Sequence, residues 1–177
     1  MTVHARLRTV GLGLALAMLV GSAASECGTQ GQRRLSPTEI AAMVKGGAGV
    51  GTSGVIGIQT VVLKGDPSKR GLYTILLRVP AHTTIAAHRH PDDRIATVVS
   101  GTWYFGYGHA FDASRLLPLP PGSFYTEPPG EDHFAETRDS DVLVQISGVG
   151  PTGTTYVRVA DDPRHFWLLS DFRGAGA

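Results

Sequence analysis

From Val55 onward the chain consists of short apolar runs in which every second residue is hydrophobic, and each run ends at a turn signal. Clear examples are "LYTILLRV", "RIATVVSG" and "DVLVQISGVG". A period of two is typical of β-strands with one buried face, and turns about every 8–12 residues are typical of sandwiches and small barrels. Glycine and proline, 23 and 11 of 177 residues, are enriched enough to supply these turns. The pattern predicts an all-β fold with a single main domain.

The sequence is expected to divide into four parts. Residues 1–25 have the pattern of a signal peptide, and residues 26–54 hold a short helix and a glycine-rich linker. Residues 55–160 carry the alternating runs, and residues 161–177 form a C-terminal tail. No internal repeat and no second domain is visible.

The first 25 residues are excluded from the fold prediction because they resemble a cleavable leader. Arg6 and Arg8 precede an apolar segment, Val10–Val20, which is followed by the small residues "GSAAS". This order is typical of a secretory signal, with cleavage expected after Ala24 or Ser25. The apolar segment is too short to span a bilayer of about 30 Å as a helix. We therefore expect export to the periplasm or the medium, and no membrane span.

Charge and cysteine content narrow the possible partners. The chain has 16 basic and 15 acidic residues, and removal of the leader takes away two arginines, which leaves a net charge of about −1. This balance does not suggest a nucleic-acid partner. Cys27 is the single cysteine, so the chain has no intramolecular disulfide. Glu26 precedes Cys27 where a lipoprotein signal has a small residue.

A helix is predicted at the start of the mature chain, over residues 36–45. Ser36 is a good N-cap, Pro37 suits the first helical position, and Glu39 completes a capping box. Its expected buried face is formed by Ile40, Met43 and Val44. Residues 46–54, "GGAGVGTSG", lie between this helix and the first strand, so a flexible linker is favoured over a phosphate-binding loop.

Three histidines carry the chemistry of this sequence. His88 and His90 are separated by one residue, so in a strand both side chains project to the same side. Two imidazoles placed in this way can bind one cation, and a third ligand must come from elsewhere in the chain. His133 is the best candidate because it begins a strand directly after a tight Pro-Pro-Gly turn.

The segments "HRHPDDRIATVVSG" and "GSFYTEPPGEDHFAET" resemble the two sequence motifs of the cupin family, over roughly residues 55–160. The matching positions are His88, His90 and Gly101 in the first motif, and Gly122, Pro128, Gly130 and His133 in the second. Two positions depart from the family pattern, since Arg94 stands at the position of a glutamate and Thr137 at that of an asparagine. The resemblance implies a jelly-roll barrel with a divalent metal held by the three histidines.

The resemblance leaves several functions open. In the family the glutamate is a fourth ligand, but three histidines and a water molecule also form a sound site for zinc. The metal ion, whether Zn, Fe, Mn or Ni, would serve a metal-dependent enzyme that is oxygenase-like and acts on a small substrate. The alternatives are a non-catalytic module that binds a small ligand or a metal, and a structural barrel whose metal site has decayed. On family grounds the chain is also expected to form homodimers.

Arg94 allows three interpretations. An inward arginine would clamp a substrate carboxylate, and an outward one would pair with Asp92 or Asp93 at the surface. In the third, Asp93 takes the role of the missing glutamate. For Arg94 considered alone, the surface pair is favoured.

Other candidates were chosen because they lie on strands that adjoin the two motifs. Besides Arg94, the residues expected to contact a substrate are Tyr104, Tyr125 and Gln145. The competing interpretation is that the aromatic residues, Phe134 included, belong to the core. His82 and His109 are expected in solvent-facing loops. Glu127 and Glu131 flank the second motif, and Glu131 is interpreted as a solvated turn carboxylate.

Overall fold

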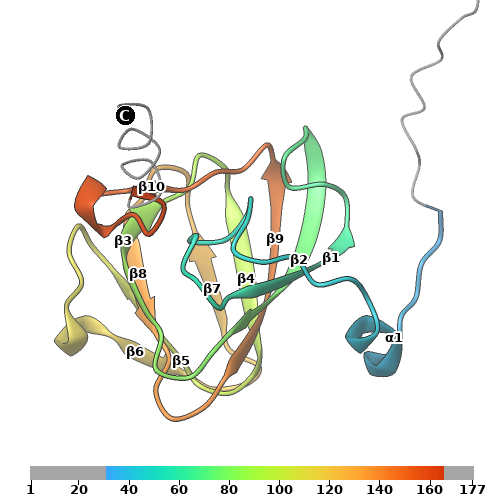
Figure 1. Ribbon diagram of the computed structural model, residues 1–177, viewed down its shortest axis with the longest axis horizontal. Helices are drawn as coiled ribbons and strands as arrows, with labels where there is room; N and C mark the ends of the chain where they lie inside the picture. The colour runs from blue at the N-terminus through green and yellow to red at the C-terminus, as the bar shows by residue number, and fades with distance from the viewer. Residues whose placement is uncertain (1–30, 166–177) are drawn as a thin grey trace, which may run out of the picture.

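The computed structural model describes residues 31–165 (Figure 1). The predicted leader and Cys27 lie outside this range, as does most of the predicted tail. Within it the elements are α1 (Pro37–Ala41), β1 (Gln59–Lys64), β2 (Gly71–Val79), β3 (Thr84–Arg89), β4 (Arg94–Ser100), β5 (Trp103–Tyr107), η1 (Ala113–Arg115), β6 (Leu117–Leu119), β7 (Phe124–Glu127), β8 (His133–Glu136), β9 (Val142–Gly150), β10 (Thr155–Tyr156) and η2 (Val159–Asp161).

The strands form two antiparallel sheets that face each other (Figure 1). The order is β1-β2-β9-β4-β7 in one sheet and β10-β3-β8-β5-β6 in the other. Strands that are distant in sequence, such as β2 and β9, are therefore neighbours, while consecutive strands often change sheets. This order is that of an eight-stranded jelly roll, β2 to β9, with one extra strand at an edge of each sheet. The predicted all-β class and jelly-roll barrel are confirmed.

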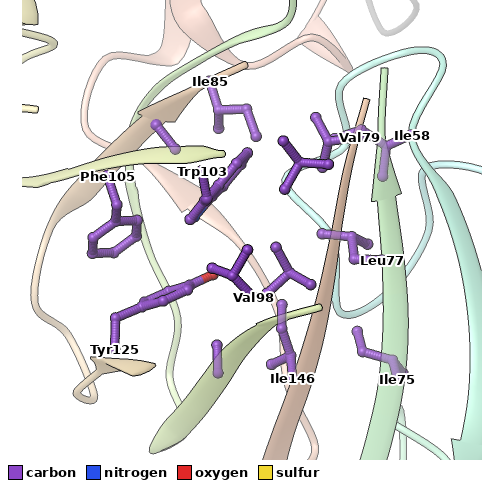
Figure 2. Close-up of a cluster of buried hydrophobic side chains, with 14 of the residues drawn as sticks. Ile58, Ile75, Leu77, Val79, Ile85, Val98, Trp103, Phe105, Tyr125 and Ile146 are labelled. Carbon is purple, nitrogen blue, oxygen red and sulfur yellow. The ribbon is translucent and has the colours of Figure 1, made fainter. Parts of the chain in front are cut away.

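The core lies between the sheets and follows from the alternation of the strands. Along β2 every second side chain, from Tyr73 to Val79, is buried, and β9 repeats this pattern from Val142 to Ile146. Figure 2 shows Trp103, Phe105 and Tyr125 among the aliphatic side chains of this cluster. Aromatic side chains therefore fill the barrel close to the histidine motifs, since the Phe105 ring lies 5.4 Å from the His133 ring.

The N-terminal helix forms as predicted but is shorter. The capping box of Ser36 and Glu39 is present, with the Ser36 hydroxyl and the Glu39 backbone N–H 3.3 Å apart. The helix ends at Ala41, and none of its residues is buried. Val44 is 91% exposed, which corrects the expectation that it belongs to a buried face. In Figure 1 the helix lies beside the barrel, near the sheet edge that β1 forms.

The glycine-rich segment 46–54 is not a free linker. Gly46 exchanges backbone hydrogen bonds with Thr60 on β1, and residues 51–53 are buried. Thr154 donates its hydroxyl hydrogen to the Thr52 carbonyl at 2.7 Å, and Tyr156 donates to the Ser53 carbonyl at 2.8 Å. The expectation of a flexible linker is corrected here, because these contacts fix the segment against the barrel.

None of the helices in residues 31–165 has the length and apolar character needed to cross a membrane.

Candidate metal centre

The barrel brings the three predicted histidines together. His88 on β3 lies directly opposite His133 on β8 in the strand register, and His90 follows β3 immediately. Each offers a ring nitrogen, and these atoms lie within 4.8 Å of one another. All three side chains are buried. The His-x-His pair and the turn before His133 are local features of the sequence. The pairing of β3 with β8 brings them together.

Backbone carbonyls determine how the three rings are oriented. Nδ1 of His88 lies 2.9 Å from the Ala86 carbonyl, and Nδ1 of His90 lies 2.6 Å from that of Gly153. Nδ1 of His133 lies 3.2 Å from the Glu131 carbonyl. A carbonyl only accepts, so each Nδ1 carries the hydrogen and each Nε2 keeps a lone pair. This tautomer is the one that binds a metal through Nε2.

The surroundings keep the rings neutral. Burial, and then the neighbouring His133, lower the pKa of His88 to about 3. Burial and the Arg94 guanidinium lower the pKa of His133 to about 4. The same two causes hold the pKa of His90 far below its usual range. Neutral imidazole is the form that a metal requires, so the site is prepared for a cation at neutral pH.

Arg94 points into the barrel and pairs with a residue that the sequence interpretation had left at the edge of a motif. It lies opposite Glu127 of β7 in the register, and its Nε is 2.9 Å from Glu127 Oε2. The two side chains are 2% and 5% exposed. The surface pair favoured from the sequence is therefore wrong. Asp93 is exposed and so does not take the role of the missing glutamate, while Asp92 accepts hydrogen bonds from Tyr73 and Thr152. The inward orientation agrees with the interpretation in which Arg94 clamps a substrate carboxylate, and that role stays a prediction.

Glu127 is the residue that sequence reasoning missed. Its Oε2 lies 3.5 Å from Nε2 of His90 and 3.8 Å from Nε2 of His133. A signal was present in the sequence, because Tyr125 and Glu127 share one face of a short strand. A carboxylate on the face that a buried tyrosine occupies is unusual unless it has a partner.

Several polar atoms at this place lack a hydrogen-bond partner within the described part of the chain. They are Nε and Nη1 of Arg94, Oε2 of Glu127, Nε2 of His133, Oγ of Ser53 and Nε1 of Trp103. The Arg94–Glu127 contact is thus a close charge pair in which the N–H does not point at the oxygen. Buried polar atoms are normally satisfied, so this group marks a place for a ligand.

The cavity between these residues is small. It measures about 20 Å³ and is lined by the three histidines, Arg94, Glu127, Tyr125 and the segment Gly51–Ser53, among others. A water molecule requires about 10–15 Å³ on this scale. The space therefore suits one water molecule or one metal ion, and the buried nitrogen and oxygen atoms around it fit a divalent metal.

The remaining candidates lie in different places. Tyr125 lines the cavity, and burial followed by the Glu127 charge raises the pKa of its hydroxyl well above the usual range. Tyr104 stacks under the Arg138 guanidinium, 3.8 Å from ring to cation, and Gln145 is exposed on the outer face of the other sheet. The expectation that Tyr104 and Gln145 line the same pocket is corrected, because each lies on the opposite face of its strand. His82 and His109 are exposed, as predicted.

Solved structures of similar fold include enzymes of different chemistry. DMSP lyase DddQ from Ruegeria pomeroyi matches at 20% identity with a TM-score of 0.48, covering 56% of this chain and 51% of that chain. A cupin-superfamily sugar phosphate isomerase from Silicibacter pomeroyi matches at 17% identity with a TM-score of 0.45, covering 56% of this chain and 65% of that chain. KdgF from Halomonas sp. matches at 22% identity with a TM-score of 0.44, covering 52% of this chain and 80% of that chain. The match spans about half the length of the lyase. No protein-family model and no curated protein matches the chain.

The strand order is that of a jelly roll, and the motif histidines meet inside it at a site that fits a metal. Together these features are those of the cupin fold, in agreement with the resemblance of the two sequence motifs. Within this fold an arginine occupies the glutamate position of the first motif, and a buried glutamate faces that arginine from the adjacent strand.

Proposed function

We propose that this protein is a cupin that works as an exported, metal-dependent enzyme, oxygenase-like and acting on a small oxygen-bearing substrate. The observation that carries the proposal is the convergence of three buried, neutral histidines whose Nδ1 atoms are held by carbonyls. Such a set of rings presents lone pairs to one point, where only a cation satisfies all of them.

A bound divalent metal would supply Lewis acidity, or dioxygen activation if it is iron. The chain supplies the rest of the chemistry. Arg94 offers Nη1, which has no partner among the described residues, as a donor to an anionic oxygen. Tyr125 retains its proton and can donate it in a hydrogen bond. Phe105 and Ile85 line the same cavity and exclude water from it.

The size of the cavity favours a second candidate. The cavity of about 20 Å³ holds one ion or one water molecule. A substrate therefore enters only if a segment that lines the cavity moves, and we call residues 51–53 the covering segment. A non-catalytic module that stores or senses a metal needs only the space for one ion that the cavity already offers. Oxygen uptake distinguishes the two functions.

Metal analysis is the first experiment. The purified protein, reconstituted with Zn, Mn, Fe or Ni, is expected to retain one equivalent of metal, and His88→Ala and His133→Ala are expected to lose it. His82→Ala, an exposed histidine, is the matched control and should behave like the wild type. Equal and low metal content in all four proteins would exclude the metal site.

Oxygen consumption is the second experiment. The Fe(II) form is assayed against a panel of phenols, enols and thiols, and the enzyme proposal expects uptake that is lost in His133→Ala. No uptake with any substrate, together with tight metal retention, would support the non-catalytic module.

Export rests on residues 1–25 and has its own test. Expressed with its leader in a Gram-negative host, the protein is expected in the periplasm or medium, with its first residue at Ser25 or Glu26. A cytoplasmic protein that begins at Met1 would contradict this part of the proposal.

A further inference from the structure

We propose that Glu127 is the fourth protein ligand of the metal, and that Arg94 is a positioning residue that holds its carboxylate. The ligand that the first motif lacks is thus supplied from the neighbouring strand. This inference rests on the proposed metal site and assigns a residue that is not among the matched positions of either motif.

The distances are those expected of ligands that share one cation. Two atoms that each lie about 2.0–2.2 Å from a tetrahedral metal are about 3.3–3.6 Å apart. Glu127 Oε2 lies 3.5 Å from Nε2 of His90 and 3.8 Å from Nε2 of His133. Both separations are longer than the roughly 2.7–3.2 Å of ordinary N–H···O hydrogen bonds, so the atoms face each other without bonding.

The electrostatics of these atoms require something positive between them. A carboxylate oxygen accepts only, and the facing Nε2 atoms hold lone pairs because the Nδ1 atoms donate to carbonyls. Acceptors that face one another in a buried site repel each other, and the low local dielectric strengthens this repulsion. Oε2 of Glu127 and Nε2 of His133 both lack hydrogen-bond partners in the part of the chain that is described. A cation bound to all three atoms removes the conflict.

Arg94 lies where it can hold the carboxylate without occupying its free lone pair. Its Nε is 2.9 Å from the same Oε2, yet the N–H does not point at that oxygen. Positions 94 and 127 are directly opposite in the β4–β7 pair, where Cβ atoms are about 4.5–5.5 Å apart. A carboxylate at either position therefore reaches the same part of the barrel. The arginine and the glutamate have in effect exchanged strands.

The exchange also changes the charge of the site. In the usual pattern the glutamate reduces the charge of the metal centre by one. Here the guanidinium of Arg94 cancels that reduction, so a divalent metal with these ligands keeps a local charge of about +2. The site therefore favours an anionic ligand, and Nη1 of Arg94 lies ready to contact it.

The test measures metal affinity of the full protein by competition with a chelator for Zn²⁺, and the absorption spectrum of the Co²⁺ form. Glu127→Gln is expected to weaken Zn²⁺ binding by about 100-fold, at or beyond the upper end of the effect of residues that only support a ligand. The Co²⁺ spectrum should change at the same time, since the ligand set changes. The matched control is Asp93→Asn, which neutralises an exposed carboxylate next to Arg94 in the chain, and its affinity and spectrum should equal those of the wild type.

A double variant separates a ligand from a mere counter-charge. Glu127→Gln alone leaves Arg94 unpaired, and its charge would repel a metal even if Glu127 were not a ligand. In Arg94→Met/Glu127→Gln both charges are absent, so affinity should stay low if Glu127 binds the metal. Recovery of wild-type affinity and spectrum would overturn the proposal. The double variant removes both buried charges, so it serves as the test if the single variant fails to fold.

The exchanged variant, Arg94→Glu/Glu127→Arg, returns the carboxylate to the position of the first motif. It is expected to bind Zn²⁺ within about tenfold of the wild type, with a Co²⁺ spectrum like that of the wild type, because both positions face the same cavity. A folded exchange variant with the affinity of Glu127→Gln would contradict the shared position.

Failure of this inference can be told apart from failure of the metal site. If His88→Ala loses Zn²⁺ while Glu127→Gln and the double variant retain it, the three-histidine site stands and the fourth ligand is rejected. If His88→Ala also retains Zn²⁺, the site itself is rejected.

Discussion

Two arginine–carboxylate pairs lie on the same sheet, one outside the barrel and one inside. Outside, Arg78 on β2 contacts Asp141 through Nη2 at 2.5 Å and Nε at 3.1 Å, with 54% and 43% of the two side chains exposed. Inside, Arg94 and Glu127 lie 2.9 Å apart and are almost wholly buried. The outer pair has two directed hydrogen bonds, whereas the inner pair has none.

The difference shows that burial decides what such a pair does. Asp141 also accepts a hydrogen bond from the Ala81 backbone, and this bond and Arg78 lower the pKa of its carboxyl. Water screens the pair, so it mainly ties a loop to β2. The inner pair cannot be justified by stability, because removal of two charges from water costs more than imperfect contact returns. Its position beside the histidines explains it instead.

Acid pH should give the largest difference between the two regions. In metal-free protein His88 and His133 have pKa values of about 3 and about 4, against about 6.5 when unfolded. Between pH 6.5 and 5 the unfolded chain binds more protons, so the free energy of unfolding falls as pH falls. Each histidine contributes about 1.4 kcal/mol per pH unit. Urea unfolding at pH 7, 6 and 5 measures the slope.

The test variant replaces a buried histidine, and the control variant replaces an exposed one. His133→Gln should have a shallower slope than the wild type, and His82→Gln should keep the wild-type slope. A stability that does not change between pH 7 and pH 5 would show that the cluster is not held neutral.

Removal of one inner charge should have the next largest effect. Arg94→Met leaves Glu127 buried without a counter-charge, which is expected to lower the free energy of unfolding of metal-free protein by about 3–5 kcal/mol. Because a bound cation replaces the lost charge, Zn²⁺ should restore part of this stability. Urea unfolding with a chelator and with Zn²⁺ gives both values, and an unchanged metal-free stability would contradict the buried pair.

A variant that loosens the covering segment, residues 51–53, tests whether the cavity around Arg94 and Glu127 is closed from solvent. Tyr156→Phe removes the hydrogen bond to the buried Ser53 carbonyl and is expected to cost about 1–3 kcal/mol. It should also speed the release of Zn²⁺ to a chelator, since residues 51–53 line the cavity. Tyr107→Phe is the control, because its hydroxyl binds the Thr126 carbonyl at an exposed position where water can replace it. Equal release rates in both variants would argue against a cover.

Removal of the outer arginine should have the smallest effect. Arg78→Met is expected to leave the urea midpoint close to that of the wild type, because the Ala81 N–H and water still satisfy Asp141. Zn²⁺ affinity should not change at all. A loss as large as that of Arg94→Met would remove the distinction between the two pairs.

The parts of the fold that were predicted are those in which local pattern is decisive. Period-two alternation gave β2, β4 and β9, and the capping box gave the start of α1. The helix ends at Ala41 and Val44 is 91% exposed, a tertiary outcome that the local sequence does not reveal. The positions of Tyr104 and Gln145 were predicted wrongly. The sequence identified the strands on which they lie, but it did not show which face of each strand points into the barrel.

The sequence by itself determined an all-β chain and the three histidines, because alternation and motif spacing lie within short stretches of backbone. Only the tertiary structure decided what those histidines face. The β4–β7 register places Glu127 opposite Arg94, and the contacts of Thr154 and Tyr156 bring residues 51–53 over the cavity. These pairs are 33 or about 100 residues apart in the chain. Their meeting depends on which strands become neighbours, and no local preference encodes that choice.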